Sequence, residues 1–158
     1  MNRQTRIETF GPIEFIGVAL FGNPETTSFH SAWQYFGEIA DDASISRVGK
    51  DLYGLQLYHP MFPKKFELLY MACIKKEPGM NVPIRMLSKI IPRCKYAVQI
   101  VESGIKGIDD ALVHLYKDYI PNSGLSIALP FDFEKYCSTR DHESMPDEIE
   151  IWVPVKDI

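Results

Sequence analysis

The stretch from Lys95 to Tyr119, KYAVQIVESGIKGIDDALVHLYKDY, joins a strand-like run to an amphipathic helix. The run KYAVQIVESG has the apolar and β-branched composition of a strand. In the segment that follows, apolar residues fall on one helical stripe, which consists of Ile108, Ala111, Leu112, Leu115 and Tyr119. Asp109 and Asp110 lie near its start, where acidic side chains favour the positive end of the helix dipole. The stretch therefore predicts a strand followed by a helix.

The same pair of elements occurs in the first half of the chain. The run IEFIGVALFG precedes SFHSAWQYFGEIA, and Thr27 stands just before this second segment, where an N-cap is expected. Its helical stripe consists of Phe29, Ala32, Trp33, Phe36, Ile39 and Ala40. Two strand-like runs follow each helix: LYGLQLY and FELLYMACI after the first, FDFEKYC and EIEIWVPV after the second. The predicted element order is β-α-β-β, twice.

The two halves match in pattern when the chain is shifted by about 79 to 81 residues. The shift places Phe29 on Ile108 and Phe15 on Tyr96, although few residues are identical. We interpret the match as an internal duplication, with repeats at about 1–80 and 84–158 within one domain of residues 1–158. One helix for every three strands predicts an α+β fold, in which both helices cover one face of an antiparallel sheet.

Composition and charge narrow the classes of function. The 158 residues are 46% hydrophobic and 24% charged, as in ordinary globular proteins. The net charge is −4 and no run of Lys or Arg occurs, so direct nucleic-acid binding is not expected. The longest apolar runs are far shorter than the ~20 residues of a membrane span. Three cysteines without CxxC spacing, and the lack of a secretory apolar region, predict a reduced, cytoplasmic protein.

The sequence carries no signal for a metal or a cofactor. The four histidines lack the spacing of metal ligands. No glycine-rich phosphate loop and no nucleophile motif of a hydrolase triad is present. We therefore expect neither a metal site nor a bound cofactor.

The segment LPFDFEKYC at 129–137 contains the best candidate for a functional side chain. Because side chains alternate along a strand, Glu134 and Tyr136 share one face and Phe131 and Phe133 share the other. A charged Glu134 would serve as a counter-ion for cationic ligands. With a raised pKa it would serve as a general acid or base. On a solvated face Glu134 would have no function.

Aromatic rings on other strands are expected to complete this site. Trp152 lies on the face of the last strand away from its isoleucines, which is unusual for a wetted surface. Met71 is its apolar counterpart in the first half, and Tyr53 falls on Glu134 in the same shift. We therefore predict a sheet face of aromatic rings around one or two carboxylates, which suits planar and cationic ligands.

Four stretches resemble the GyrI-like or AraC-type effector-binding domain, a SOUL/Rob-like small-molecule module that is also fused to bacterial multidrug-responsive transcription activators. They are IPRCKYAVQIVESG, YIPNSG, PFDFEKY, which resembles the P-x-x-x-E-x-Y strand of the family, and EIEIWVPV. The pairs Ala32-Trp33 and Tyr53-Gly54 resemble positions of the first half. The chain departs from the pattern at Arg93-Cys94, where a small residue is frequent.

The resemblance implies two β-α-β-β units related by pseudo-twofold symmetry, with a ligand cleft between them. It also implies that Glu134 is the acidic group that faces the ligand, with Tyr136 two residues on. Tyr96 matches the tyrosine of the family's first strand. Trp33 lies on the core stripe of its helix, so core packing is its expected role and a contact at the cleft edge is the alternative.

Three functions are compatible with these residues. The first is capture of a hydrophobic aromatic, in one version cationic, small molecule, with a protein partner such as a regulator needed for signalling. Its expected ligand-binding residues are Glu134, Tyr136, Tyr53, Tyr96, Trp152, Trp33 and Met71. The second, which the resemblance allows, is hydrolysis of cyclopropane-containing genotoxins, with Glu134 and Tyr136 as catalytic residues. The third is inhibition of DNA gyrase, ranked last because a charge of −4 is modest for a DNA mimic.

Overall fold

The computed structural model describes residues 5–102, 104–138 and 148–158. Within them are the helices α1 (His30–Asp42), α2 (Ile108–His114) and α3 (Ile120–Asn122), a 3-10 turn η1 (Gly104–Gly107) and a π-helical turn η2 (Leu115–Tyr119). The strands are β1 (Thr5–Phe10), β2 (Ile13–Gly22), β3 (Leu52–Tyr58), β4 (Leu68–Lys75), β5 (Leu87–Ile91), β6 (Cys94–Val101), β7 (Leu125–Ile127), β8 (Phe131–Tyr136) and β9 (Ile149–Asp157). The mixed α+β composition predicted from the sequence is confirmed.

The strands described form one sheet in which every pair is antiparallel. Their order is β1-β6-β9-β8-β3-β4-β2-β5, and β7 pairs with β9. The central pair is β3 and β8, which come from the first and second halves of the chain. Their register sets Gly54 opposite Glu134 and Gln56 opposite Asp132. The middle of the sheet is therefore the place where the two halves meet.

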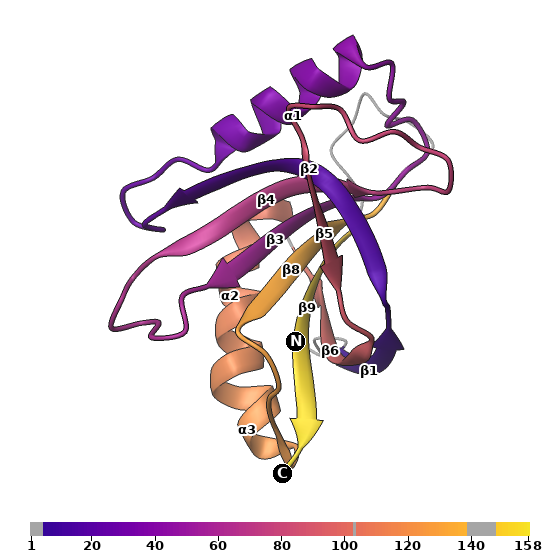
Figure 1. Cartoon of the computed structure of the whole chain (residues 1–158). Coiled ribbons are helices and arrows are strands. Elements are labelled where there is room, and N and C mark those ends of the chain that lie inside the picture. The colour runs from indigo at the N-terminus through magenta and orange to yellow at the C-terminus, as the bar shows by residue number, and fades with distance from the viewer. Residues whose placement is uncertain (1–4, 103, 139–147) are drawn as a thin grey trace.

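Helix α1 lies across one part of the sheet, over β2 and β4 (Figure 1). Its apolar stripe is buried as the spacing predicts, at Ala32, Phe36, Ile39 and Ala40. These side chains pack on the sheet residues Ile16, Leu68, Tyr70, Ala72 and Ile74. Trp33, on the same stripe, is only partly buried at the edge of this cluster.

The second helical segment lies over β6 and β9 and runs from η1 through α3. It covers an apolar cluster that includes Ala97, Val101, Ile149, Ile151 and Val153. The predicted helix is interrupted by the π-helical turn η2. In this turn Leu115 is fully buried, and the next residue, Tyr116, also packs against the cluster. A wider turn of this kind allows neighbouring side chains to face the sheet together.

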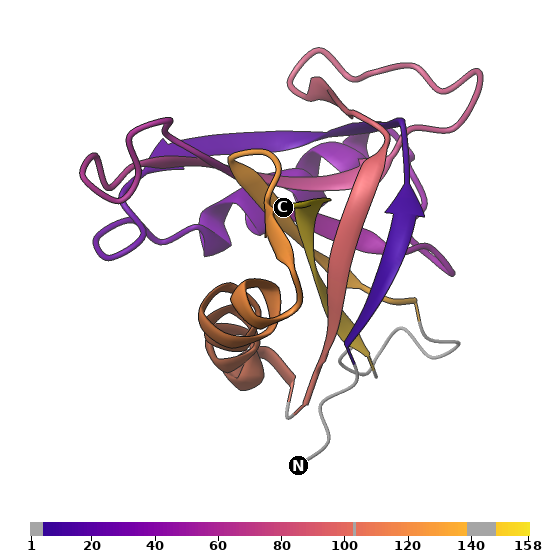
Figure 2. The same cartoon turned by 90° about the horizontal axis from the view of Figure 1, so that it is seen from below.

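The sheet face away from the helices is closed rather than open. The sheet curls (Figure 2). Side chains from every described strand except β7 meet in one largely aromatic cluster. Phe10 on β1 lies 5.0 Å from Trp152 on β9, and Phe133 stacks on Trp152 at 5.4 Å between ring centroids. The expectation that the rings around Trp152 form a ligand-binding face with Glu134 is therefore wrong, because they are packed in the core. Alternation indicates which face a side chain takes, but it does not indicate that the sheet folds over that face.

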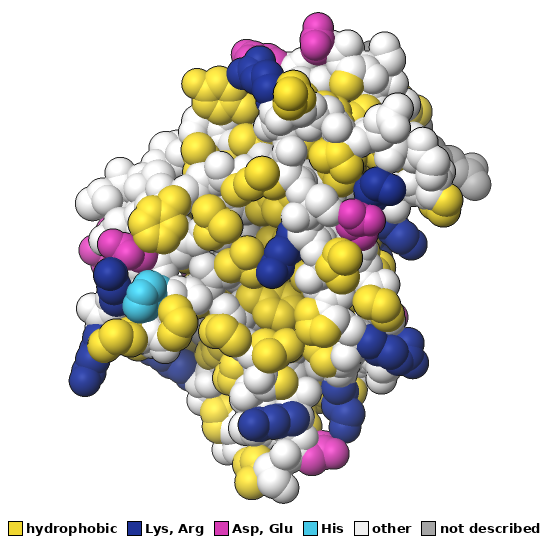
Figure 3. Space-filling view, in the orientation of Figure 1, with side chains coloured by type: hydrophobic (Ala, Val, Ile, Leu, Met, Phe, Trp, Pro, Cys, Tyr) yellow, Lys and Arg dark blue, Asp and Glu magenta, His cyan; other side chains and the backbone are white. Residues whose placement is uncertain are grey.

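Apolar side chains gather on the outer surface seen in Figure 3, where β5 crosses the sheet. On and just before β5, Ile84, Leu87 and Ile90 are exposed. β5 is the last strand in the order of the sheet and has a neighbour on one side, β2. None of the helices in the described residues is both long enough and apolar enough to cross a membrane.

Candidate functional site

Glu134 lies on the helix-covered face of the central strand β8 and is 6% exposed. Its Oε1 accepts a hydrogen bond from the Tyr70 hydroxyl at 3.0 Å, and its Oε2 accepts one from Tyr136 at 2.7 Å. The Trp33 Nε1–H in turn donates to the Tyr70 hydroxyl oxygen at 2.8 Å. Side chains from α1, β4 and β8 thus converge on one carboxylate. Of the predicted site residues, Glu134, Tyr136 and Trp33 are brought together.

Burial raises the pKa of the Glu134 carboxyl above its ordinary value, and the hydrogen bonds from Tyr136 and Tyr70 offset part of this rise. The pKa values of both tyrosines are also raised, first by burial and then by the neighbouring carboxylate. Both hydroxyls therefore keep their protons and act as donors to Glu134. A carboxyl in this setting can exchange a proton closer to neutral pH than an exposed one.

Gly54 makes the room for this arrangement. A Cβ atom built on Gly54 would lie 2.4 Å from the Tyr70 hydroxyl oxygen and 2.7 Å from Glu134 Oε1. Both distances are far shorter than van der Waals contact, so no side chain fits without moving the two polar groups. The absence of a side chain at Gly54 therefore leaves the space in which the Tyr70 hydroxyl and the Glu134 carboxylate form their hydrogen bond.

We expect Gly54→Ala to lower the free energy of unfolding by about 1–3 kcal/mol, because overpacking displaces the Tyr70 and Glu134 side chains. Urea unfolding measures this change. The matched control is Gly37→Ala in α1, where an added Cβ meets nothing within 4 Å. That variant should gain roughly 0.5–1 kcal/mol from helix propensity. A Gly54→Ala protein as stable as the wild type would show that the packing over Gly54 is not as described.

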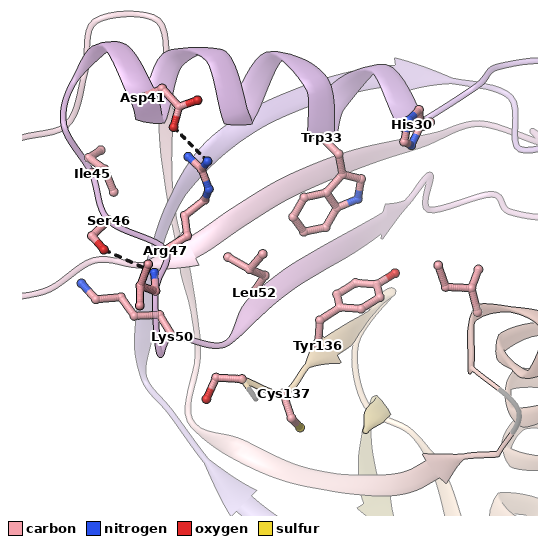
Figure 4. Close-up of a pocket in the computed structure, with 13 residues that line it drawn as sticks. His30, Trp33, Asp41, Ile45, Ser46, Arg47, Lys50, Leu52, Tyr136 and Cys137 are labelled. Atoms are coloured by element: carbon pink, nitrogen blue, oxygen red, sulfur yellow. Dashed lines mark hydrogen bonds and ion pairs between the residues drawn. The ribbon is translucent and has the colours of Figure 1, made fainter. Parts of the chain in front are cut away.

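A pocket of about 750 Å³ opens next to Tyr136 (Figure 4). It lies between α1, the segment 43–51 that follows α1, the start of β3 and the end of β8. Trp33 and Tyr136 both line it and contact each other edge to face, with 5.6 Å between ring centroids. Apolar side chains of Ile45, Leu52 and Ile105 add to its lining. The volume and the lining suit a small aromatic molecule.

The outer part of the pocket carries charged side chains. Arg47 forms an ion pair with Asp41 at 2.9 Å, and Lys50 forms one with Glu77 at 3.1 Å. Cys137 also lines the pocket, and burial raises the pKa of its thiol to about 12. At neutral pH this sulfur is therefore a protonated thiol and a poor nucleophile.

A second buried carboxylate, Asp132, lies two residues before Glu134 on the same face of β8. Its Oδ2 accepts hydrogen bonds from the hydroxyls of Tyr58 and Tyr116, each at 2.7 Å. Its Oδ1 is buried and has no hydrogen-bond partner among the described residues. Burial raises the pKa of Asp132 to about 7, against the effect of the two tyrosines, and Glu134 adds to the rise.

The remaining predicted site residues lie on the opposite face of the sheet. Tyr53, Met71, Tyr96 and Trp152 are all buried in the aromatic cluster. The register explains the separation, because the residue of β3 that faces Glu134 is Gly54 rather than its neighbour Tyr53. These four side chains pack in the core on the face of the sheet opposite Glu134, and none of them reaches it.

A group with metal-ligand potential includes Cys137, at the outer part of the pocket. One ligand atom from each of Cys137, Glu148 and Glu150 lies within 4.8 Å of the others. Glu150 is buried, pairs with Arg6 at 2.8 Å and approaches Lys135 at 3.9 Å. These two cations compensate the charge of Glu150 without a metal ion.

Sequence reasoning missed three contributors to the site. Asp132 follows from the same alternation that places Glu134 and Tyr136 on one face, so the signal was present in FDFEKY. Tyr70 alternates with Met71 in the same way, but its contact with Glu134 depends on the register of three strands. Arg47, on the segment after α1, carried no signal, since loop positions follow no period.

The family profile of the GyrI-like small molecule binding domain matches residues 3–156. The chain belongs to this family. The match spans both halves of the chain and includes every residue described around Glu134. No curated protein matches the chain at a significant level. The resemblance noted in PFDFEKY and EIEIWVPV is therefore confirmed at the level of the family.

Solved structures of the same fold cover nearly the whole chain. An integron cassette protein from Vibrio cholerae aligns with a TM-score of 0.71 and 17% identity, over 98% of this chain and 97% of its own. SAV2435 bound to tetraphenylphosphonium aligns with a TM-score of 0.69 and 18% identity, over 97% and 94%. A hydrolase from Listeria innocua, encoded by lin2189, aligns with a TM-score of 0.64 and 13% identity, over 98% and 92%. At these identities the likeness concerns the fold.

Proposed function

We propose that this GyrI-like chain captures hydrophobic aromatic small molecules in the pocket between α1 and the end of β8. The observation that carries the proposal is the pair of rings, Trp33 and Tyr136, that contact each other in the wall of the pocket, with the Tyr136 hydroxyl donating to the buried Glu134. Planar ligands bury a large area against such rings. A pocket of about 750 Å³ is within the range of small-molecule sites.

We propose further that Glu134 favours cationic members of this ligand class. None of the ion pairs among the described residues includes Glu134, so its charge has no internal counter-ion. A cation beside it would lower its pKa and replace the missing positive charge. Support also comes from SAV2435, a protein of the same fold that was solved with the aromatic cation tetraphenylphosphonium.

Glu134→Gln should abolish the preference for a cation over a neutral ligand of the same shape. Methylquinolinium and methylnaphthalene form such a pair, since they differ in one ring atom and the charge. We expect the wild type to bind methylquinolinium about tenfold more tightly, the value of one charge-assisted interaction of about 1.4 kcal/mol. Isothermal titration calorimetry at pH 8 measures both dissociation constants.

The matched control is Glu38→Gln, which removes the same charge from an exposed position of α1. This control should keep the preference of the wild type. If Glu134→Gln keeps it as well, Glu134 is not the counter-ion. If neither ligand binds to the folded wild-type protein, capture of aromatic molecules in this pocket is wrong.

A second candidate function is hydrolysis of reactive, cyclopropane-containing small molecules. Two observations favour it: the pKa of Glu134 is raised by burial, and the Tyr136 hydroxyl donates to the same carboxylate. In this version Glu134 would activate water as a general base, and Tyr136 would orient the substrate. A protein from Listeria innocua with the same fold is named a hydrolase. Turnover of a cyclopropane electrophile that survives in Glu134→Gln would contradict these roles.

We infer that the two halves, at about 1–80 and 84–158, are copies of one unit within a single domain and are related by a pseudo-twofold axis. The strand order supports this inference. Outward from the central pair, β3 is followed by β4, β2 and β5, and β8 by β9, β6 and β1. The site then lies on the seam between the two units. We also infer a reducing, cytoplasmic location, which the three free cysteines favour.

A further inference from the structure

Two buried carboxylates lie side by side on the floor between the helices. Asp132 and Glu134 are two residues apart on β8, so their side chains share a face and their Cα atoms are roughly 6.6 Å apart. Asp132 is fully buried and Glu134 is 6% exposed. Across the strand pair, Gln56 faces Asp132 and Gly54 faces Glu134. The floor therefore presents a polar strip in an otherwise apolar setting.

No ion pair in the described part of the chain reaches this strip. None of the ion pairs among the described residues includes Asp132 or Glu134, and the hydrogen-bond partners of both are neutral tyrosine hydroxyls. Buried carboxylates without a cation are costly, and each is normally paired. A molecule that brings positive charge to this strip would be stabilised by both.

One oxygen of Asp132 is also left without a hydrogen-bond donor. Tyr58 and Tyr116 both donate to Oδ2, whereas Oδ1 is buried without a partner in the described part of the chain. An unsatisfied buried acceptor costs about 1–3 kcal/mol, which a donor placed beside it would recover. Oδ1 is thus the one acceptor of this carboxylate that a further N–H group would satisfy.

We propose that Asp132 is a second recognition group of the cleft, and that its preferred ligands are aromatic diamines with one ammonium group at Glu134 and another at Asp132. This inference rests on the proposed binding of aromatic molecules beside Trp33 and Tyr136. Along β8 the order is Tyr136 at the pocket, then Glu134, then Asp132. Neither carboxylate lines the pocket, so the chain with two amines reaches Glu134 and Asp132 by displacing the Tyr136 and Tyr70 side chains that now cover them. Two amines separated by four carbons span about the distance between alternate residues of a strand.

The protonation state of Asp132 agrees with this role. Its pKa of about 7 means that the carboxyl is largely ionised at pH 8. An ammonium group next to Oδ1 would lower this pKa further. Binding of the diamine should therefore strengthen between pH 6 and pH 8, as Asp132 loses its proton.

The test compares two probes on the whole chain at pH 8 by isothermal titration calorimetry. The first is the naphthylmethyl derivative of putrescine, which has two amines separated by four carbons. The second is naphthylmethyl-pentylamine, in which a methyl group replaces the second ammonium. We expect the wild type to bind the diamine about tenfold more tightly. Asp132→Asn should reduce this ratio to about twofold or less, whereas Asp118→Asn, the loss of an exposed carboxylate on η2, should keep it.

The outcomes separate this inference from the function on which it rests. Equal affinity of the wild type for both probes, or a ratio that survives in Asp132→Asn, would overturn the role of Asp132 while leaving the aromatic pocket intact. Failure of both probes to bind the wild type would overturn the pocket and the inference together. The comparison of the two probes on the wild type decides the matter even if Asp132→Asn does not fold.

Discussion

At pH 8 the Asp132→Asn variant should be more stable than the wild-type protein, by on the order of 2–4 kcal/mol. The reason is the raised pKa of Asp132, about 7 in the folded protein against an ordinary value of 3.8. Between these two values the folded protein binds more protons than the unfolded chain. The free energy of unfolding therefore falls as the pH rises from about 4 to 7 and stays low above that range. Asparagine carries no charge, and its carbonyl oxygen can accept the hydroxyls of Tyr58 and Tyr116.

The measurement is urea unfolding of both proteins at several pH values from 4 to 8. Burial also raises the pKa of Glu134, which contributes with the same sign. The stability difference between the wild type and Asp132→Asn isolates Asp132 from this second group. We expect the difference to grow steadily from pH 4 to 7. A difference that stays constant over this range would show that Asp132 is not buried as a carboxyl of raised pKa.

The second large effect is expected for Trp33→Ala, which removes one of the two contacting rings that line the pocket. The affinity for methylnaphthalene and methylquinolinium should fall roughly 10- to 100-fold, the loss of about 1.5–3 kcal/mol of aromatic contact. Trp33→Phe keeps a ring but loses the Nε1–H that donates to Tyr70. It should lose less affinity than the alanine variant. Calorimetric titration of each variant measures these changes.

Tyr35→Ala is the matched control for this prediction. Tyr35 lies on the same helix, is 48% exposed and does not line the pocket. Its removal should leave both dissociation constants within about twofold of the wild-type values, since an exposed ring contributes no contact to a ligand in the pocket. Equal losses in Trp33→Ala and Tyr35→Ala would instead point to a general effect on α1.

Periodicity in the sequence predicts most of the regular elements of the fold. The stripes of α1 and of the second helical segment are buried as expected, and six of the strands, from IEFIGVALFG to EIEIWVPV, were recognisable as apolar runs. β5 was not recognised because four of its five residues are exposed and its side chains show no alternation. The curl of the sheet could not be predicted either, since it depends on contacts such as that of Phe10 with Trp152.

The candidate site could be predicted in part. The alternation in FDFEKY gave the shared face of Glu134 and Tyr136, and the family resemblance singled out Glu134. The partner Tyr70 could not be derived, because a contact across three strands requires the register of each pair. Trp152 was assigned to the site because a tryptophan on the face away from the helices was interpreted as a ligand contact, whereas in the fold this face is the aromatic core.

The central claim, an aromatic binding site lined by Trp33 and Tyr136 and next to Glu134, is tested most directly by a crystal structure of the protein with methylquinolinium. The account predicts the ligand ring packed in the pocket against these two side chains, with its charged nitrogen on the side of Glu134. A ligand bound at another surface, with the pocket beside Trp33 and Tyr136 empty, would contradict the account.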